Sequence, residues 1–425
     1  MADNIIRKPI EFELNTQGNP KTNSLKNIGL ILNGDPLLHG TFKYNEFAYS
    51  IDVVKDIPQL FIEKGQLDDS YSAIMLRYIE DEYGVMFQEK LLNMAITVEA
   101  KSHPYNPVKE YMEKCYKNWD HKERIKDFLP VYLGVPSGEV TTLQTKLFLV
   151  GAVMKVYKPE SKFDWVFDLV GGQGVGKTTL LKKLAHGWYT DQFTDFKDKD
   201  NFANMLRALI VNDDEMTATN NSDFENLKKF ISAEELEFRP PYGRHTIRRP
   251  KNFVMARTTN ESTYLKDKTG ERRFLPNMAD KSQAMANPVT DLDDTMVNHI
   301  WGEAVGLYKE GFSFILTKEQ QKLIEDNRKM FMYIDETENQ IERVLSTWDD
   351  DWIESSEIAH QLGEDNLVKN RSLAKKIKYV MDNRHDWKAG QKRKGGVVHR
   401  GYRRVNTLKV ILVYSLKSCY FNVCR

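Results

Sequence analysis

The sequence predicts an α/β protein with a helical N-terminal domain and a C-terminal winged helix. An apolar run over 164–170 leads into a glycine-rich loop and then into leucines at helical spacing over 180–185, which is the order strand, loop, helix. Two more apolar runs, 208–212 and 252–256, end in polar residues, as strands do. In the last third of the chain, two amphipathic segments precede a glycine-centred hairpin pattern.

Composition sets outer limits on class and partners. The 425 residues are 41% hydrophobic and 29% charged, which is ordinary for a soluble globular protein with two or three domains. Lysine plus arginine and aspartate plus glutamate both total 61, so any affinity for nucleic acid has to be local. The cysteines Cys115, Cys419 and Cys424 lack metal-site spacing, and no secretory or membrane-spanning segment is visible. A reduced protein of the cytoplasm, without a membrane partner, is expected.

The loop after the first strand reads Gly-x-x-x-x-Gly-Lys-Thr, which is the pattern of a phosphate-binding loop. Its glycines let backbone N–H groups turn toward a di- or triphosphate, and the next helix adds the positive end of its dipole. Lys177 can reach the β- and γ-phosphates, and the Thr178 hydroxyl can bind Mg²⁺. A chance match is expected on the order of once in a hundred chains of this length. The predicted nucleotide-binding residues are Gly171, Gly172, Gln173, Gly174, Val175, Gly176, Lys177, Thr178 and Thr179.

The second strand ends in three carboxylates, Asp213, Asp214 and Glu215. Downstream of a phosphate loop, Asp214 is expected to hold Mg²⁺ through water and Glu215 to polarise the attacking water. Asp213 is the competing metal ligand. Asn260, at the tip of the third strand, is expected to orient the same water. ATP and Mg²⁺ are therefore the predicted substrate and metal.

Two arginine-bearing segments follow the carboxylates. The segment 237–249 has Pro-Pro-Tyr-Gly at its centre and predicts a basic hairpin whose tip suits single-stranded nucleic acid through Arg239, Tyr242, Arg244 and His245. The alternative is a solvated turn whose arginines pair with the glutamates of 234–237. Farther on, Arg272 and Arg273 lie on a turn before a strand, a place typical of an arginine that reaches the γ-phosphate of another subunit.

The C-terminal third carries the one strongly basic stretch. Helices over 355–363 and 370–384 and a hairpin over 388–404 predict a winged helix. Twelve basic residues between 371 and 404 face two aspartates, which is an electrostatic footprint for duplex DNA. A solvated face on a protein-docking winged helix is the alternative. The predicted contacts are Arg371, Lys375, Lys376, Lys378, Lys392, Arg393 and Lys394.

Taken together, these motifs resemble the virulence-associated E proteins of phages and mobile islands, which are similar to superfamily 3 helicases of the AAA+ class. The segments that carry the resemblance are 162–164, 171–178, 214–215, 239–244, 258–260, 269–274 and 300–304. The resemblance implies a ring-forming ATPase, usually a hexamer, that draws single-stranded DNA through its centre during replication. It also implies that Asn260 is the sensor, that Arg272 or Arg273 is the finger in trans, and that 239–245 is the pore loop.

The predicted organisation is a helical N-terminal domain over 1–150 for oligomerisation or as a collar, an ATPase core over 151–330, an acidic linker over 331–350 and a winged helix with a C-terminal tail over 351–425. The predicted function is an ATP-dependent DNA helicase and replication initiator. One alternative is an initiator that melts an origin, uses ATP as an assembly switch and recruits another helicase. The other is an ATPase that remodels proteins.

Overall fold

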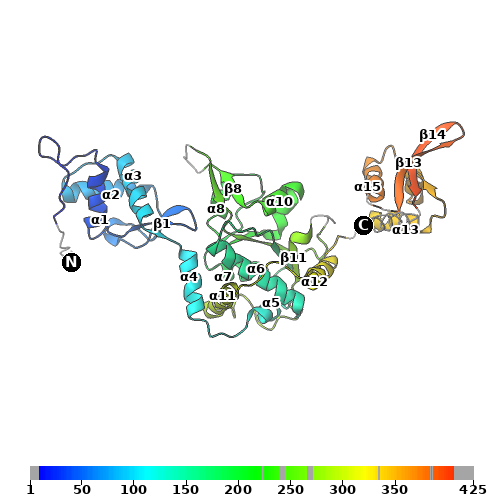
Figure 1. Ribbon diagram of the computed structural model, residues 1–425, viewed down its shortest axis with the longest axis horizontal. Coiled ribbons are helices and arrows are strands. Elements are labelled where there is room, and N and C mark those ends of the chain that lie inside the picture. The colour runs from blue at the N-terminus through cyan, green and yellow to red at the C-terminus, as the bar shows by residue number, and fades with distance from the viewer. Residues whose placement is uncertain are drawn as a thin grey trace, which may run out of the picture. The chain divides into compact units, whose positions relative to one another are not determined.

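The apolar runs of the sequence form a five-stranded parallel sheet in the computed structural model (Figure 1). Its spatial order is β11-β5-β10-β7-β6. Every residue of β5, β7 and β10 is buried, which explains why their sequences do not alternate between apolar and polar. The strands are β5 (Val166–Val170), β6 (Tyr189–Thr190), β7 (Ile210–Asp213), β10 (Val254–Thr259) and β11 (Phe274–Met278).

The structure describes residues 9–222, 224–239, 245–265, 271–333, 336–382, 384 and 386–405. The chain separates into two units, Met1–Phe331 and Met332–Arg425. Among the described helices, none combines the length and the apolar character needed to cross a membrane.

The N-terminal part of the first unit contains a sheet, which corrects the prediction of a purely helical domain. Four strands in the order β3-β2-β1-β4 pack against the helices. The strands have two to four residues each, too few for a period-2 pattern to stand out in the sequence. The elements are α1 (Leu25–Gly34), β1 (Phe42–Asn45), β2 (Ser50–Val53), the 3-10 turn Pro58–Leu60, β3 (Gly65–Gln66), α2 (Ser70–Tyr83), α3 (Glu89–Ser102) and β4 (Pro104–Tyr105).

The next three helices share the hydrophobic core of the central sheet, although the sequence pattern assigned them to the N-terminal domain. They are α4 (Pro107–Lys117), α5 (Ile125–Leu133) and α6 (Glu139–Tyr157). Nearly all of α6 is buried, so this helix is apolar around its whole circumference and needs neighbours on every side. In the described part of the chain, the hydrophobic cluster of the N-terminal elements extends to Ala100, and that of the central sheet takes in Phe47 and the chain from Val108 onward, so the change of core comes well before residue 150.

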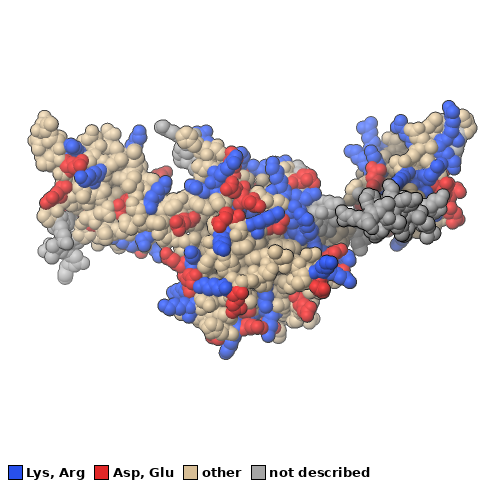
Figure 2. Space-filling model, viewed as in Figure 1, with Lys and Arg blue, Asp and Glu red and all other residues tan. Residues whose placement is uncertain are grey.

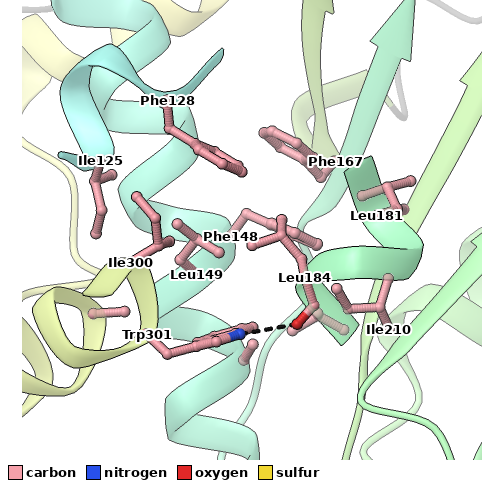
Figure 3. Packing of buried hydrophobic residues seen from close by; sticks show 14 of the residues in the cluster. Ile125, Phe128, Phe148, Leu149, Phe167, Leu181, Leu184, Ile210, Ile300 and Trp301 are labelled. Atoms are coloured by element: carbon pink, nitrogen blue, oxygen red, sulfur yellow. Dashed lines mark hydrogen bonds between the residues drawn. The ribbon is translucent and has the colours of Figure 1, made fainter. Parts of the chain in front are cut away.

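Helix α6 covers one face of the central sheet (Figure 3). The ring of Phe148 on α6 stacks on Phe167 of β5 with centroids 4.4 Å apart. The indole of Trp301 donates a hydrogen bond to the carbonyl oxygen of Leu184 at 2.9 Å, which satisfies the buried N–H group. This packing holds β5, which leads into the glycine-rich loop, against α6.

The remaining elements of the first unit surround the sheet (Figure 1). Thr317 caps helix α12 with a complete capping box. The elements are α7 (Lys177–Ala185), α8 (Asp200–Met205), the 3-10 turn Asp214–Met216, α9 (Thr217–Asn221), α10 (Phe224–Ser232), β8 (Glu235–Phe238), β9 (Ile247–Pro250), the 3-10 turn Glu271–Arg273, α11 (Asp294–Lys309) and α12 (Lys318–Lys329).

The described residues of the second unit form three helices and a three-stranded antiparallel sheet in the order β12-β14-β13 around their own hydrophobic cluster. The helices and the hairpin that the sequence predicts between 355 and 404 are both present. The predicted strand over 408–416 and the tail after it lie outside the described residues. The elements are α13 (Glu336–Thr347), β12 (Trp352–Ile353), α14 (Ser355–Gln361), α15 (Arg371–Asp382), β13 (Trp387–Lys394) and β14 (Val397–Arg404).

Candidate functional site

The glycine-rich loop runs from the carboxyl end of β5 to the start of α7, as predicted. Gly171 has a φ of +149° and Gly176 a φ of +98°, conformations that L side chains rarely adopt. A Cβ atom on Gly171 would lie 2.3 Å from the carbonyl oxygen of Ala279, and one on Gly176 would lie 2.3 Å from Cγ of Pro288. Both positions therefore require glycine, and the loop is packed against 279–288 on its outer side.

The ammonium group of Lys177 lies inside this loop. It donates hydrogen bonds to the carbonyl oxygens of Gly171 at 2.6 Å and Gly172 at 3.0 Å and to Oδ1 of Asn260 at 3.0 Å. Burial lowers the pKa of Lys177, and the carboxylates of Glu215 and Asp214 oppose that shift. The lysine that the sequence assigned to phosphate thus lies where the ends of β5 and β10 meet.

The Asp214 carboxylate accepts hydrogen bonds from hydroxyl groups on two other elements. Its Oδ1 accepts hydrogen bonds from Oγ1 of Thr178 and from Oγ1 of Thr258, both at 2.7 Å. Asn212 donates to the same oxygen at 3.2 Å. The predicted metal-binding pair, Thr178 and Asp214, is therefore in direct contact across the gap between α7 and the end of β7.

Glu215 and Met216 form a strained corner after β7. Both residues have a φ of +51°, which is uncommon for residues other than glycine. The corner turns the Glu215 carboxylate toward Asn260, whose amide donates to Oε2 at 3.1 Å and to Oε1 at 3.3 Å. The N–H group of Glu215 donates to Oγ1 of Thr258 at 3.1 Å. The structure therefore brings Lys177, Asn260 and Glu215 into one chain of contacts.

Asp213, the competing metal ligand, is engaged in the fold. Its Oδ1 accepts from the N–H of Ala218 at 2.8 Å, and its Oδ2 accepts from the N–H of Thr219 at 2.8 Å and from the Thr219 hydroxyl at 2.6 Å. Burial raises the pKa of Asp213, and these hydrogen bonds oppose the shift. The two oxygens close the corner 213–219, which leaves Asp214 as the aspartate that faces the loop.

The arginine pair lies at the opposite end of the sheet. Arg272 and Arg273 immediately precede β11, whose first residue pairs with Val166 at the amino end of β5. The guanidinium of Arg273 donates to the Ser232 hydroxyl at 3.1 and 2.9 Å. Both arginines line a cavity of about 500 Å³, together with Asp164, Trp165, Phe314, Ile315, Leu316, Gln321, Ile324, Glu325 and Arg328.

The basic hairpin is described only at its base. Strands β8 and β9 pair antiparallel, and Arg239 and His245, which flank the tip, are exposed. The other two predicted contacts, Tyr242 and Arg244, lie outside the described residues. Arg248 forms an ion pair with Glu237 at 3.0 Å, so the alternative of arginine–glutamate pairing holds for Arg248.

The second unit exposes a basic surface. Arg371, Lys375 and Lys378 follow one another at helical spacing on α15, and all three are exposed. Lys376, by contrast, forms an ion pair with Glu338 at 2.7 Å. Arg393 is exposed and Lys392 half-buried on β13, while the Lys394 side chain is outside the description. Figure 2 shows lysine and arginine side chains along the β13–β14 hairpin.

Four residues of this region were not predicted as site residues from the sequence: Asn212, Thr258, Asp168 and Arg257. Thr258 lies two positions before Asn260, so its side chain shares a face of β10 with the predicted sensor, and this spacing was a usable signal. Asp168 and Arg257 form a buried ion pair at 2.6 Å between β5 and β10. No spacing in the sequence relates two residues that meet only through strand register.

Two solved structures and one protein family are similar to this chain. The two structures are titled as the apo A form of the NrS-1 C-terminal region, and one of them is given as residues 305–718. Each is 13% identical to this chain, and the match covers 86% of this chain and 96% of the other. Their TM-scores are 0.45 and 0.38. No curated protein matches the sequence. A family model described as the virulence-associated protein E-like domain matches residues 112–333. Because that segment is more than half of the 425 residues and contains the loop, the carboxylates and the arginine pair, the protein belongs to the virulence-associated protein E-like family.

Proposed function

We propose that this protein is an ATP-hydrolysing ring motor of the AAA+ class that acts on DNA as a replicative helicase of a mobile element. The observation that carries the proposal is the convergence of Lys177, Asp214, Glu215 and Asn260 from two strand ends and one helix start around a glycine-rich loop. The strand order supports the class, because β10 lies between β5 and β7 and so brings Asn260 between the loop and the carboxylates.

The residues present fit ATP and Mg²⁺. The positive φ angles of Gly171, Gly174 and Gly176 suit a backbone that turns its N–H groups toward phosphate. Lys177 would exchange its carbonyl partners for phosphate oxygens. Thr178 and Asp214 would hold Mg²⁺, which neutralises charge on the β- and γ-phosphates, with water completing the shell.

Glu215 and Asn260 are suited to the attacking water. The exposed carboxylate of Glu215 accepts from the Asn260 amide, so the two side chains face the same space beside Lys177. In the proposed reaction Glu215 accepts the proton of the water, and Asn260 orients that water for in-line attack on the γ-phosphate.

The arginine pair supports catalysis between subunits. Arg272 or Arg273 would offset charge on the γ-phosphate bound to a neighbouring copy, since both lie at the sheet end opposite their own phosphate loop. A closed ring, with six subunits as the resemblance implies, provides such a neighbour at every site.

Two basic surfaces support a DNA substrate. The hairpin β8–β9, with Arg239 and His245 beside its tip, would contact one strand in the pore of the ring. The second unit has the helices and hairpin of a winged helix, and Arg371, Lys375 and Lys378 would enter the groove of duplex origin DNA.

The test is turnover by a Glu215→Gln variant. We expect ATP affinity within about threefold of the wild-type value and turnover reduced by about a hundredfold or more, because the variant keeps the loop and loses the base. The control is Glu261→Gln, an exposed glutamate next to Asn260, which should turn over normally. Undiminished turnover by Glu215→Gln would reject the assigned role.

Strand displacement separates the motor from the two alternatives. Unwinding of a long duplex by the purified protein supports a helicase. ATP binding with melting of a short site but no processive unwinding supports an initiator that recruits another motor. ATP turnover that polypeptide stimulates and single-stranded DNA does not would favour protein remodelling.

A further inference from the structure

A row of three charged residues crosses the middle of the central sheet. Strand register pairs Arg257 on β10 with Asp168 on β5 and with Asp213 on β7. All three are almost completely buried, with 2%, 0% and 1% of their surface exposed. The guanidinium of Arg257 grips both oxygens of Asp168, with Nε at 2.8 Å and Nη2 at 2.6 Å, and the hydroxyl of Tyr264 also donates to Asp168.

Stability alone is a weak explanation for this row. Removing an ion pair from water costs several kcal/mol per ion, and apolar residues of similar volume often serve a core equally well. The residues on either side of Asp168 on β5, Phe167 and Leu169, are apolar and buried, so an apolar side chain would suit that position as well. The charged row therefore points to a further use of the guanidinium.

On one side, Arg257 contacts the corner that carries the proposed catalytic carboxylates. Its Nη1 lies 3.5 Å from Oγ1 of Thr219, and that hydroxyl donates to Oδ2 of Asp213 at 2.6 Å. Asp213 and Thr219 are the two ends of the corner, and Glu215 lies between them in a strained conformation. The guanidinium contacts Thr219 directly and Asp213 through the Thr219 hydroxyl, and this link restricts where the Glu215 carboxylate can lie.

On the other side, Arg257 contacts the strand that follows the arginine pair. The centre of its guanidinium lies 3.9 Å from the ring centroid of Phe274, a cation–π contact in a buried setting. Phe274 comes directly after Arg273 and begins β11. The same guanidinium thus contacts Thr219, which supports the carboxylate corner, and Phe274, which adjoins the arginine pair.

We propose that Arg257 is a positioning residue: through Thr219 and Asp213 it fixes the carboxylate corner 213–219, and through Phe274 it couples that corner to Arg272 and Arg273. This inference rests on the proposed ATPase activity. It assigns Arg257 no contact with nucleotide. Loosening the network should therefore slow turnover and leave ATP binding unchanged.

Thr219 offers a test that spares the buried ions. Thr219→Val keeps the shape and removes the hydroxyl, and Thr219→Ser keeps the hydroxyl. We expect Thr219→Val to lower kcat by about tenfold to a hundredfold with KM for ATP within about twofold, and Thr219→Ser to restore turnover. The control is Thr145→Val, which removes a buried hydroxyl that donates to the carbonyl of Thr141 at 2.7 Å, outside this network.

Three outcomes decide the question. Wild-type kcat in Thr219→Val overturns the positioning role. A Thr219→Ser variant as slow as Thr219→Val also overturns it, because turnover would then depend on the packing of the whole side chain and not on its hydroxyl. Absence of ATP turnover in the wild-type protein refutes the proposed function and this inference together. Either of the first two outcomes, when the wild-type protein turns over ATP normally, refutes the inference alone.

A second variant tests Arg257 directly. The triple change Asp168→Leu, Arg257→Met and Tyr264→Phe replaces the ion pair and the hydroxyl by apolar groups, and Asp213 keeps its hydrogen bonds from Ala218 and Thr219. We expect a Tm equal to or above that of the wild type, together with a kcat lowered by about tenfold or more at an unchanged KM. A triple variant that is folded and turns over at the wild-type rate would show that the network serves packing only.

Discussion

The arginine pair and the phosphate loop of one chain are too far apart to meet, and this predicts complementation between variants. Phe274 pairs with Val166, and Met278 pairs with Val170, the residue before Gly171. Five steps along a strand at about 3.3 Å each place the start of β11 about 16 Å from the level of Gly171. Arg273 lies one residue farther back, so its side chain does not reach its own loop.

The perturbation is a mixture of two inactive proteins. Lys177→Ala removes the phosphate-binding lysine and keeps the arginines, and the double variant Arg272→Ala, Arg273→Ala does the reverse. In rings assembled at random from equal amounts, about one interface in four combines an intact loop with an intact arginine pair, so turnover should recover to about a quarter of the wild-type rate.

The assay is steady-state phosphate release with single-stranded DNA present, at protein concentrations that favour assembly. The matched control mixes Lys177→Ala with Glu215→Gln. Both changes damage the loop side of the site, so no interface in that mixture is complete and turnover should stay at baseline. Activity of the first mixture no greater than the mean of its components would refute catalysis between subunits.

Three further predictions follow from the packing and the charges. Gly302→Ala should lower the free energy of unfolding by about 1–3 kcal/mol, since its Cβ would lie 2.6 Å from Cβ of Trp119, whereas Gly29→Ala on α1, with open space around it, should raise it by about 0.5–1 kcal/mol in urea titrations. Burial lowers the pKa of Lys251 to about 7. Above that pH the folded chain has released this proton while the unfolded chain still holds it, so the free energy of unfolding should rise from about pH 7 to 9. Lys251→Met should reduce that rise in unfolding curves measured across the same pH range. Arg371→Ala, Lys375→Ala and Lys378→Ala should each reduce the salt dependence of duplex binding by about one unit in a log–log plot of anisotropy-derived affinity, and Lys376→Ala, paired with Glu338, should reduce it less.

Features set by neighbouring residues were predictable from the sequence. The loop of 171–176, the cap at Thr317 and the hairpin around Gly395 and Gly396 depend on local backbone preferences, and the structure contains each of them. The carboxylates after the second strand were predicted as well, with Asp214 chosen ahead of Asp213, but the backbone conformation behind that choice was not. That choice depends on the positive φ angles of Glu215 and Met216, which no propensity of these residues favours.

Features set by long-range packing were not predictable. The N-terminal strands are short, and their partners lie up to about sixty residues away, so nothing local marks them. The assignment of α4–α6 failed because neither an amphipathic helix nor a fully apolar one shows in its sequence which core it joins. Asp168, Arg257 and Asp213 are brought together by parallel register alone, and an aspartate inside an apolar strand gives no sign of its partner.

In the proposed ring, the central sheet acts as a spacer between consecutive sites. Each chain would hold its own nucleotide at the carboxyl end of β5 and present Arg272 and Arg273 to the next nucleotide from the amino end of β11, so the length of the strands sets the distance between the two. Buried parallel strands resist stretching, because every residue of β5 and β10 is packed on both faces. In such a rigid sheet, a shift of the carboxylate corner would also move the arginine pair. Arg257 contacts Thr219 in that corner and Phe274 beside the arginine pair, so it would transmit the shift.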